Sequence, residues 1–169
     1  MAEVIKVIGK NAFVQVFEST RGMRVGDEAE FEGHMLEVTL GPGMLSRNYD
    51  GLQNDLDKME GVFLKRGEYT FPLDNDKLWD FKPLAKVGDK VAAGGWLGEV
   101  DENFQPHKIM VPFTFKGEYT VKSLKEAGQY TIGEVIAVLT DETGKDVEVT
   151  MIQRWPVKRA ITCYKEKPR

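Results

Sequence analysis

A phrase punctuated by glycine occurs twice in the second half of this chain, and the repeat limits the folds open to it. Each copy has a glycine turn, a short β-branched run, a second glycine turn and a longer apolar run. Gly88 matches Gly128, and Gly94 matches Gly133 with one residue's difference in spacing. Glycine supplies the positive φ that tight turns need, and β-branched runs favour strands. The copies, residues 87–100 and 127–139, therefore predict two related half-motifs that form a small flattened β-sandwich with approximate twofold symmetry.

Composition sets outer limits on what such a chain does. Its 169 residues are 41% hydrophobic, which suits one or two domains with a real core. A net charge of -4 argues against nucleic acid as a partner, because phosphate binding needs a concentrated basic surface. The single cysteine, Cys163, excludes an internal disulfide. We expect a cytoplasmic setting without direct membrane insertion, since neither a leader-like segment nor an apolar run of about 18 residues occurs.

The first 43 residues predict strands of an incomplete barrel. Residues 4–8 and 13–17 are apolar runs on either side of a Gly-Lys-Asn turn, and residues 34–40 alternate between apolar and polar. A small antiparallel barrel needs roughly five or more strands. We therefore expect residues 1–43 to be part of an N-terminal β-barrel whose first strands lie outside the chain.

The segment that follows changes its period. Its apolar residues recur at helical spacing, which predicts a helical connector over residues 44–60, as one helix or as two short helices broken near Gly51. These residues are Leu45, Tyr49, Leu52, Leu56 and Met59. Residues 61–153 are predicted to form the sandwich domain, beginning with extended chain up to residue 86. Residues 154–169 hold six basic side chains against one acid and are predicted to be a solvated linker rather than a nucleic-acid-binding tail. The fold class is mainly β.

The sandwich layout resembles the barrel-sandwich hybrid of biotinyl and lipoyl carrier domains. In those domains the modified lysine lies on the central strand pair, where this chain has Lys108. A biotinyl site, however, has Met on both sides of its lysine, whereas His107 and Ile109 flank Lys108 here. A carrier domain modified at Lys108 is therefore the alternative hypothesis, because likeness of fold alone does not transfer function.

A second resemblance covers nearly the whole chain. Several phrases resemble, in the same order and at similar distances, the catalytic A subunit of V-type and A-type rotary ATPases. They include Gly41-Pro42-Gly43, Asp50-Gly51-Leu52-Gln53, and residues 65–67, 79–83, 87–89, 107–112 and 155–157. The chain departs from the family at Asn54-Asp55 and at residues 160–162, where the family usually has Arg-Pro.

The resemblance implies the latter part of the N-terminal β-barrel followed by the bulge domain, without the nucleotide-binding domain. The parent protein would couple ATP hydrolysis or synthesis to proton or sodium transport, using ATP and Mg. It would work with B subunits in an alternating ring and with peripheral stalk subunits, on the cytoplasmic face of the membrane. This chain has no G-x-x-x-x-G-K-[ST] phosphate loop, which ATP hydrolysis requires. We therefore expect a structural segment that is inactive alone, with no catalytic residue and no cofactor of its own.

Other reactive residues favour structural interpretations. His34 and His107 are far apart in sequence and the only cysteine is near the end, so the ligand spacing of a zinc site is absent. Cys163 is predicted to be a free thiol rather than a nucleophile. The Gly-rich residues 94–98 are not followed by a helical pattern, which indicates turns rather than phosphate binding. We expect no metal site.

Overall fold

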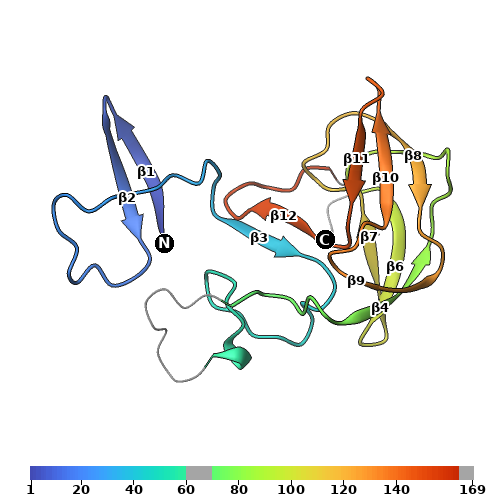
Figure 1. The fold of residues 1–169 in the computed structure, drawn as a ribbon, viewed down its shortest axis with the longest axis horizontal. Helices are drawn as coiled ribbons and strands as arrows, with labels where there is room; N and C mark the ends of the chain where they lie inside the picture. The colour runs from blue at the N-terminus through green and yellow to red at the C-terminus, as the bar shows by residue number, and fades with distance from the viewer. Residues whose placement is uncertain (60–69, 164–169) are drawn as a thin grey trace.

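Strands dominate the computed structural model, which describes residues 1–59 and 70–163 (Figure 1). The predicted mainly β fold class is confirmed. The elements are β1 (Ala2–Ile8), β2 (Asn11–Val16), β3 (Glu37–Leu40), a 3-10 helix η1 (Leu56–Lys58), β4 (Leu78–Pro83), β5 (Lys90–Val91), β6 (Trp96–Glu102), β7 (Gln105–Met110), β8 (Tyr119–Leu124), β9 (Gly128–Thr131), β10 (Ala137–Asp141), β11 (Asp146–Val149) and β12 (Gln153–Pro156).

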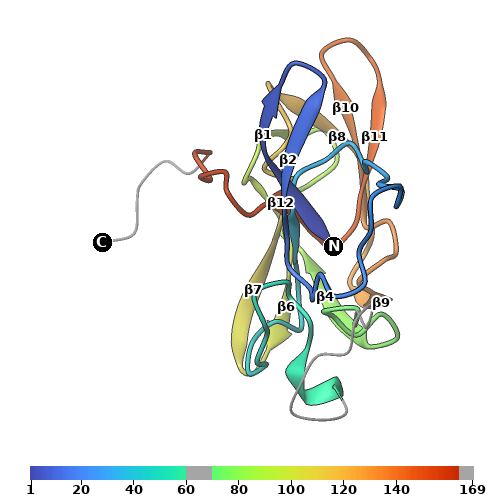
Figure 2. The same ribbon diagram turned by 90° about the vertical axis from the view of Figure 1, so that its left-hand side faces the viewer.

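Two four-stranded sheets make the sandwich, and their strand orders contain the twofold relation that the repeat predicts. One sheet has the order β7-β6-β4-β9 and the other has the order β11-β10-β8-β5. The repeat relates β4, β5, β6 and β7 to β8, β9, β10 and β11. Each half therefore supplies a hairpin and one long strand to its own sheet and gives its short strand to the other sheet. The β6–β7 and β10–β11 hairpins point to opposite ends of the molecule (Figure 2).

The core follows the same symmetry, because matched positions fall into opposite clusters. Leu97 packs in the second cluster listed below, and its match, Ile136, packs in the first. Val100 packs in the first cluster, and its match, Leu139, packs in the second. All four side chains are at most 1% exposed. The first cluster consists of Leu73, Trp79, Phe81, Val100, Ile109, Ile132, Ile136 and Met151. The second consists of Leu97, Val111, Val121, Ala137, Leu139 and Val149.

Gly98 marks a place where the two halves have diverged. A Cβ atom at this position would lie 2.2 Å from the ring of Phe81, so the glycine makes room for the aromatic side chain. At the matched place in the second half, Ala137 packs in the same cluster as the smaller Val121. The size of the side chain on β4 or β8 thus determines whether the neighbouring hairpin strand, β6 or β10, carries glycine or alanine at the facing position.

The N-terminal strands form two separate two-stranded sheets. β1 and β2 pair in a hairpin with an irregular register between Val4 and Lys6, and β3 pairs with β12. Neither sheet closes into a barrel within the described residues. The β1–β2 hairpin lies apart from the sandwich (Figure 1), and Ile5, Val7 and Phe13 are each more than half exposed.

The connector contains less helix than its apolar spacing predicts. Within residues 44–59, the part of the predicted connector that the structure describes, η1 is the single helical turn. The preceding residues form turns, with Gln53 in the left-handed region at φ 63° and an isolated bridge between Tyr49 and Asp55. The prediction of an α-helix in this segment is therefore wrong. Its buried polar side chains, described below, bind backbone groups that lie outside the segment.

Some predicted features lie at or beyond the limits of the described chain. Residues 60–69, which include the Arg66-Gly67 phrase, are outside the described residues, as are residues 164–169. The predicted linker begins inside β12, where Trp155 is buried and its Nε1 donates to the Arg159 carbonyl at 2.6 Å. The first part of that segment thus packs against the fold.

Candidate functional site

Buried polar side chains gather where the connector meets the sandwich. Within the described parts of the chain they are Gln53, Asn54, Asp55 and Glu102. The first three precede η1, and Glu102 ends β6. A buried polar group is costly unless it is hydrogen-bonded, so each of these side chains needs partners within the fold.

Glu102 ties the connector to the β6–β7 hairpin. Its Oε1 accepts hydrogen bonds from the backbone N–H groups of Gly43 at 2.8 Å and Leu45 at 2.9 Å. Its Oε2 lies 2.7 Å from Nδ1 of His107 on β7. Gly43 has φ 103°, so the turn that presents its N–H group needs glycine. One carboxylate with 2% exposure thus holds two segments that are far apart in the sequence.

The side-chain amide of Gln53 binds the backbone of β3 as a neighbouring strand would. Its Nε2 donates to the Thr39 carbonyl at 2.7 Å, and its Oε1 accepts from the Thr39 N–H at 2.7 Å. A side-chain amide offers the same donor and acceptor pair as a backbone residue. It therefore satisfies both backbone groups of Thr39 in the way a neighbouring strand would.

Asp55 and Asn54 hold the connector closed around the start of the sandwich domain. The Asp55 carboxylate is fully buried and pairs with Arg47, while Lys58 Nζ lies 3.9 Å away. The Asp55 N–H donates to Thr70 Oγ1 at 2.8 Å, and the Thr70 N–H donates to Asn54 Oδ1 at 3.0 Å. The hydrogen bond to Asp55 raises the pKa of Arg47. Asn54 and Asp55 are thus central to this network.

Tyr49 forms a further contact between the connector and the start of the sandwich domain. Its hydroxyl donates to the Pro72 carbonyl at 2.8 Å. Burial raises the pKa of this phenol above its ordinary value, and the nearby Asp55 charge raises it further. A phenol that stays protonated can keep donating to this carbonyl, so Tyr49 ties the connector to the chain at Pro72.

Lys108 lies within a strand rather than at a hairpin tip. Its Nζ pairs with Glu99 on β6 and is 5.0 Å from the centroid of the Trp96 ring. The hydrogen bond from Lys108 lowers the pKa of Glu99. The Lys108 side chain is 24% exposed, and the tip of its hairpin is formed by Asn103 and Phe104 instead. A carrier lysine has to be presented freely to a modifying enzyme, so this geometry disfavours the carrier alternative.

The other candidate residues have separate surroundings. His34 lies 3.6 Å from Glu32, whereas His107 belongs to the Glu102 contact. No group of three His, Cys, Asp or Glu residues that could hold a metal ion occurs in the described chain. Cys163 is half-buried beside the turn at Gly94, whose N–H group donates to the Val111 carbonyl at 3.0 Å. This glycine turn binds the protein's own backbone.

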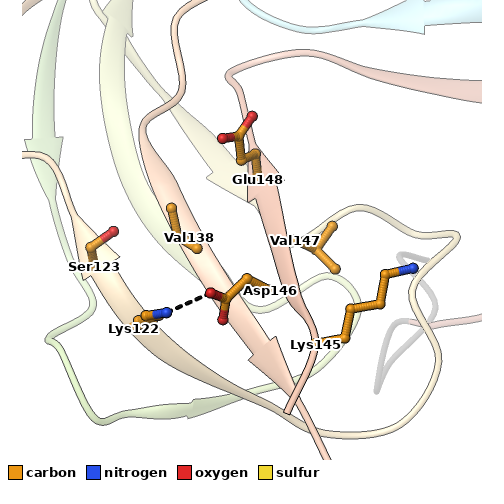
Figure 3. Close-up of a pocket in the computed structure, with 7 residues that line it drawn as sticks. All are labelled: Lys122, Ser123, Val138, Lys145, Asp146, Val147 and Glu148. Atoms are coloured by element: carbon orange, nitrogen blue, oxygen red, sulfur yellow. Dashed lines mark hydrogen bonds and ion pairs between the residues drawn. The ribbon is translucent and has the colours of Figure 1, made fainter. Parts of the chain in front are cut away.

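An open hollow lies on the outer face of the second sheet, over β8, β10 and β11 (Figure 3). Lys122 reaches across it to Asp146, while Lys145 and Glu148 are directed away from that pair. Thr140 Oγ1 also donates to Asp146 at 2.7 Å. The two hydrogen bonds, first that from Lys122, lower the pKa of Asp146. The exposed pair links β8 to β11 across β10 on the surface of the sheet.

Sequence reasoning missed Glu102, Asn54 and Asp55 as important residues. A usable signal existed for Glu102, because strict alternation along β6 places it on the same face as the buried Val100. An acid on a core-facing position has to find donors. The signal for Asn54 and Asp55 is weaker, because Arg47 precedes Asp55 by eight residues and Thr70 follows it by fifteen. Among the described residues, no helix is long and apolar enough to cross a membrane.

Comparison with known proteins gives matches over most of the chain. Residues 70–158 match the family model described as ATP synthase alpha/beta subunit barrel-sandwich domain. Residues 1–33 match the one described as ATP synthase alpha/beta family, beta-barrel domain.

Similar full-length proteins extend these matches across the connector. The V-type ATP synthase alpha chain of Treponema denticola is 47% identical over 98% of this chain. Those of Borrelia garinii subsp. bavariensis and Treponema pallidum (alpha chain 1) are 48% and 46% identical over the same share. In each case the match covers 29% of the relative's length.

Proposed function

The chain belongs to the ATP synthase alpha/beta family, and from that premise we propose that it is a structural segment of an ATP-hydrolysing A subunit of a V-type ATPase. It would comprise the latter part of the N-terminal β-barrel and the bulge domain. The whole subunit would couple ATP hydrolysis or synthesis to proton or sodium transport, with ATP and Mg held outside this segment. The similarity to V-type alpha chains over 98% of the chain carries the proposal.

The chemistry of the junction supports a structural role. Each of the four buried polar side chains binds backbone or side-chain groups of the chain itself. Groups that are satisfied in this way rigidify a fold and are not available for a substrate. The family matches also favour this interpretation over a carrier modified at Lys108.

We further propose two kinds of partner within the assembled complex. The exposed apolar side chains of the β1–β2 hairpin, such as Val7 and Phe13, suit burial in a ring of barrels formed with B subunits. The sandwich would project outward toward the peripheral stalk. The complex would place the segment on the cytoplasmic face of the membrane.

A chimera tests this function. The matching segment of the Treponema denticola alpha chain is replaced by this chain, and the complex is assembled with the other subunits of that organism. We expect ATP hydrolysis coupled to ion transport, because the segment supplies structure and not chemistry. In a control chimera, a Gly/Ser linker replaces residues 70–158, and we expect coupled transport to be lost. If the first chimera fails to assemble while circular dichroism shows the isolated chain folded, the proposal is wrong.

A further inference from the structure

The tip of the β6–β7 hairpin places a large aromatic residue in a backbone conformation that disfavours it. Glu102 pairs with Gln105, so Asn103 and Phe104 form a two-residue turn. Their φ angles are 53° and 65°, both in the left-handed region. Hairpin turns of this kind prefer Asn followed by Gly. Asn103 fits that preference, but Phe104 occupies the position where glycine would be least strained.

The Phe104 side chain gains nothing from the fold in return. It is 98% exposed, which is more than any other large hydrophobic side chain described in residues 70–158. Val87 follows at 65% and Trp96 at 57%. A strained backbone conformation that displays a bare aromatic ring is a reason to look for a function at that position.

The tip is also held rigidly, which preorganises the ring. The Phe104 N–H donates to Asp101 Oδ1 at 2.9 Å, and Asn103 Nδ2 donates to Ser46 Oγ at 3.1 Å. Immediately before the turn, the buried Glu102 fixes the hairpin to the backbone of Gly43 and Leu45. An aromatic anchor with few rotatable bonds on a braced turn loses little entropy on binding.

We propose that Phe104 is a docking anchor that inserts into an apolar pocket of another polypeptide in the assembled complex. This inference rests on the proposed function. Buried aromatic anchors of this kind contribute much of the energy of protein interfaces. The rim of the pocket would carry hydrogen-bond donors or a basic group, since the exposed Asp101 carboxylate stands at the base of the tip.

Charge argues against a lipid surface as the occupant. Membrane-binding tips combine aromatic residues with basic side chains that attract anionic lipids. Residues 101–106 contain Asp101 and Glu102 and no Lys or Arg. Among nearby cations, Arg47 is paired with Asp55 and Lys108 with Glu99. The tip therefore presents an apolar ring next to acidic side chains.

A glycine substitution separates docking from a structural role. Phe104→Gly relieves the left-handed strain, so the melting temperature of the isolated chain should stay unchanged or rise. Phe104→Leu, which keeps an apolar side chain, is the matched control. A fall of several degrees in the glycine variant would show that the ring stabilises the fold, and would overturn the proposal.

Photo-cross-linking in the chimeric complex tests the partner directly. p-Benzoylphenylalanine replaces Phe104 in one sample and the exposed Val87 in another, and both complexes are irradiated. We expect a covalent adduct with a second polypeptide from position 104, at least about 10-fold above the yield from position 87. An assembled, ATP-hydrolysing complex that gives no such adduct, or an adduct with lipid alone, overturns the docking proposal and leaves the proposed function intact. Failure of the chimera to assemble rejects the proposed function, and the anchor with it.

Discussion

At the scale of single residues, Glu102 is the side chain on which the junction depends most. It is buried, charged and bound to donors from the connector and from β7. Removing such an acceptor leaves two backbone N–H groups and an imidazole without their partner. The cost of that loss exceeds the value of any one of these hydrogen bonds, because unsatisfied buried donors keep their full desolvation penalty.

We predict that Glu102→Ala lowers the free energy of unfolding by about 3 kcal/mol. Glu102→Gln should cost less, because its amide oxygen can still accept from the Gly43 and Leu45 N–H groups. Glu148→Ala, at an exposed position on β11, is the matched control and should change the free energy by less than about 0.5 kcal/mol. Urea titration followed by circular dichroism measures all three. Equal stabilities of the two alanine variants would show that Glu102 does not hold the junction.

Gly98 and Phe81 provide a second test at this scale. Gly98→Ala places a methyl group against the Phe81 ring and should destabilise the chain by about 1–3 kcal/mol. Phe81→Val by itself leaves a cavity and should also destabilise the chain. The double variant reproduces the Ala137 and Val121 combination of the other half, so its loss should be clearly less than the sum of the two single losses. Additive losses would mean that the two positions are not coupled.

At the scale of elements, Lys122 on β8 and Asp146 on β11 link strands on either side of β10. Because the pKa of Asp146 is lowered in the folded chain, its contribution to stability is complete above the ordinary value of about 3.9. The contribution is lost as pH falls through the lowered folded value. It is small, since the pair is exposed to solvent.

We predict that Lys122→Met raises the pKa of Asp146 toward its ordinary value and weakens the loss of stability at acid pH. Carboxyl carbon chemical shifts followed by NMR during a pH titration report the change. Lys145→Met is the control, because Lys145 points away from this pair (Figure 3) and should leave the Asp146 titration nearly unchanged. A larger effect from Lys145 than from Lys122 would contradict the assignment.

The strands were predictable from the sequence where their signals are local. Glycine turns at Gly88 and Gly128 and the apolar runs after them specify strands whatever lies elsewhere in the chain. The connector was not predictable in the same way, because Gln53 and Asp55 are directed by Thr39, Arg47 and Thr70. Apolar spacing records which residues face the core and not which backbone groups are bound, so the same spacing fitted a helix that does not form.

At the scale of the whole molecule, we predict that the purified chain does not bind ATP. It contains no Gly-rich phosphate loop, and the buried side chains of Gln53, Asn54, Asp55 and Glu102 are bound within the fold. Calorimetric titration of the chain with Mg-ATP should give no saturable heat, whereas a full-length relative serves as the positive control. Saturable binding at micromolar concentration would contradict the structural role.

We also predict a gradient of amide hydrogen exchange across the molecule. Residues 109–111 and 135–139 should exchange slowly, since Ile109, Val111 and Leu139 are at most 2% exposed. Residues 4–17 should exchange fastest, because their hairpin is a two-stranded sheet with open edges. Mass spectrometry of peptic peptides resolves both regions. Uniform protection would contradict the prediction, and protection of residues 4–17 that rises with concentration would show pairing with a second copy.

The exchange of β5 and β9 between the two halves makes the sandwich a single cooperative unit. Neither half can unfold alone, because each would take a strand out of the other's sheet. Damage to one half is therefore shared by both, and partial unfolding of the sandwich has no stable stopping point. The same interlocking limits what either half can do by itself. A chain that held a single half would have a sheet one strand short, so such a half would need the short strand of a second copy to complete it.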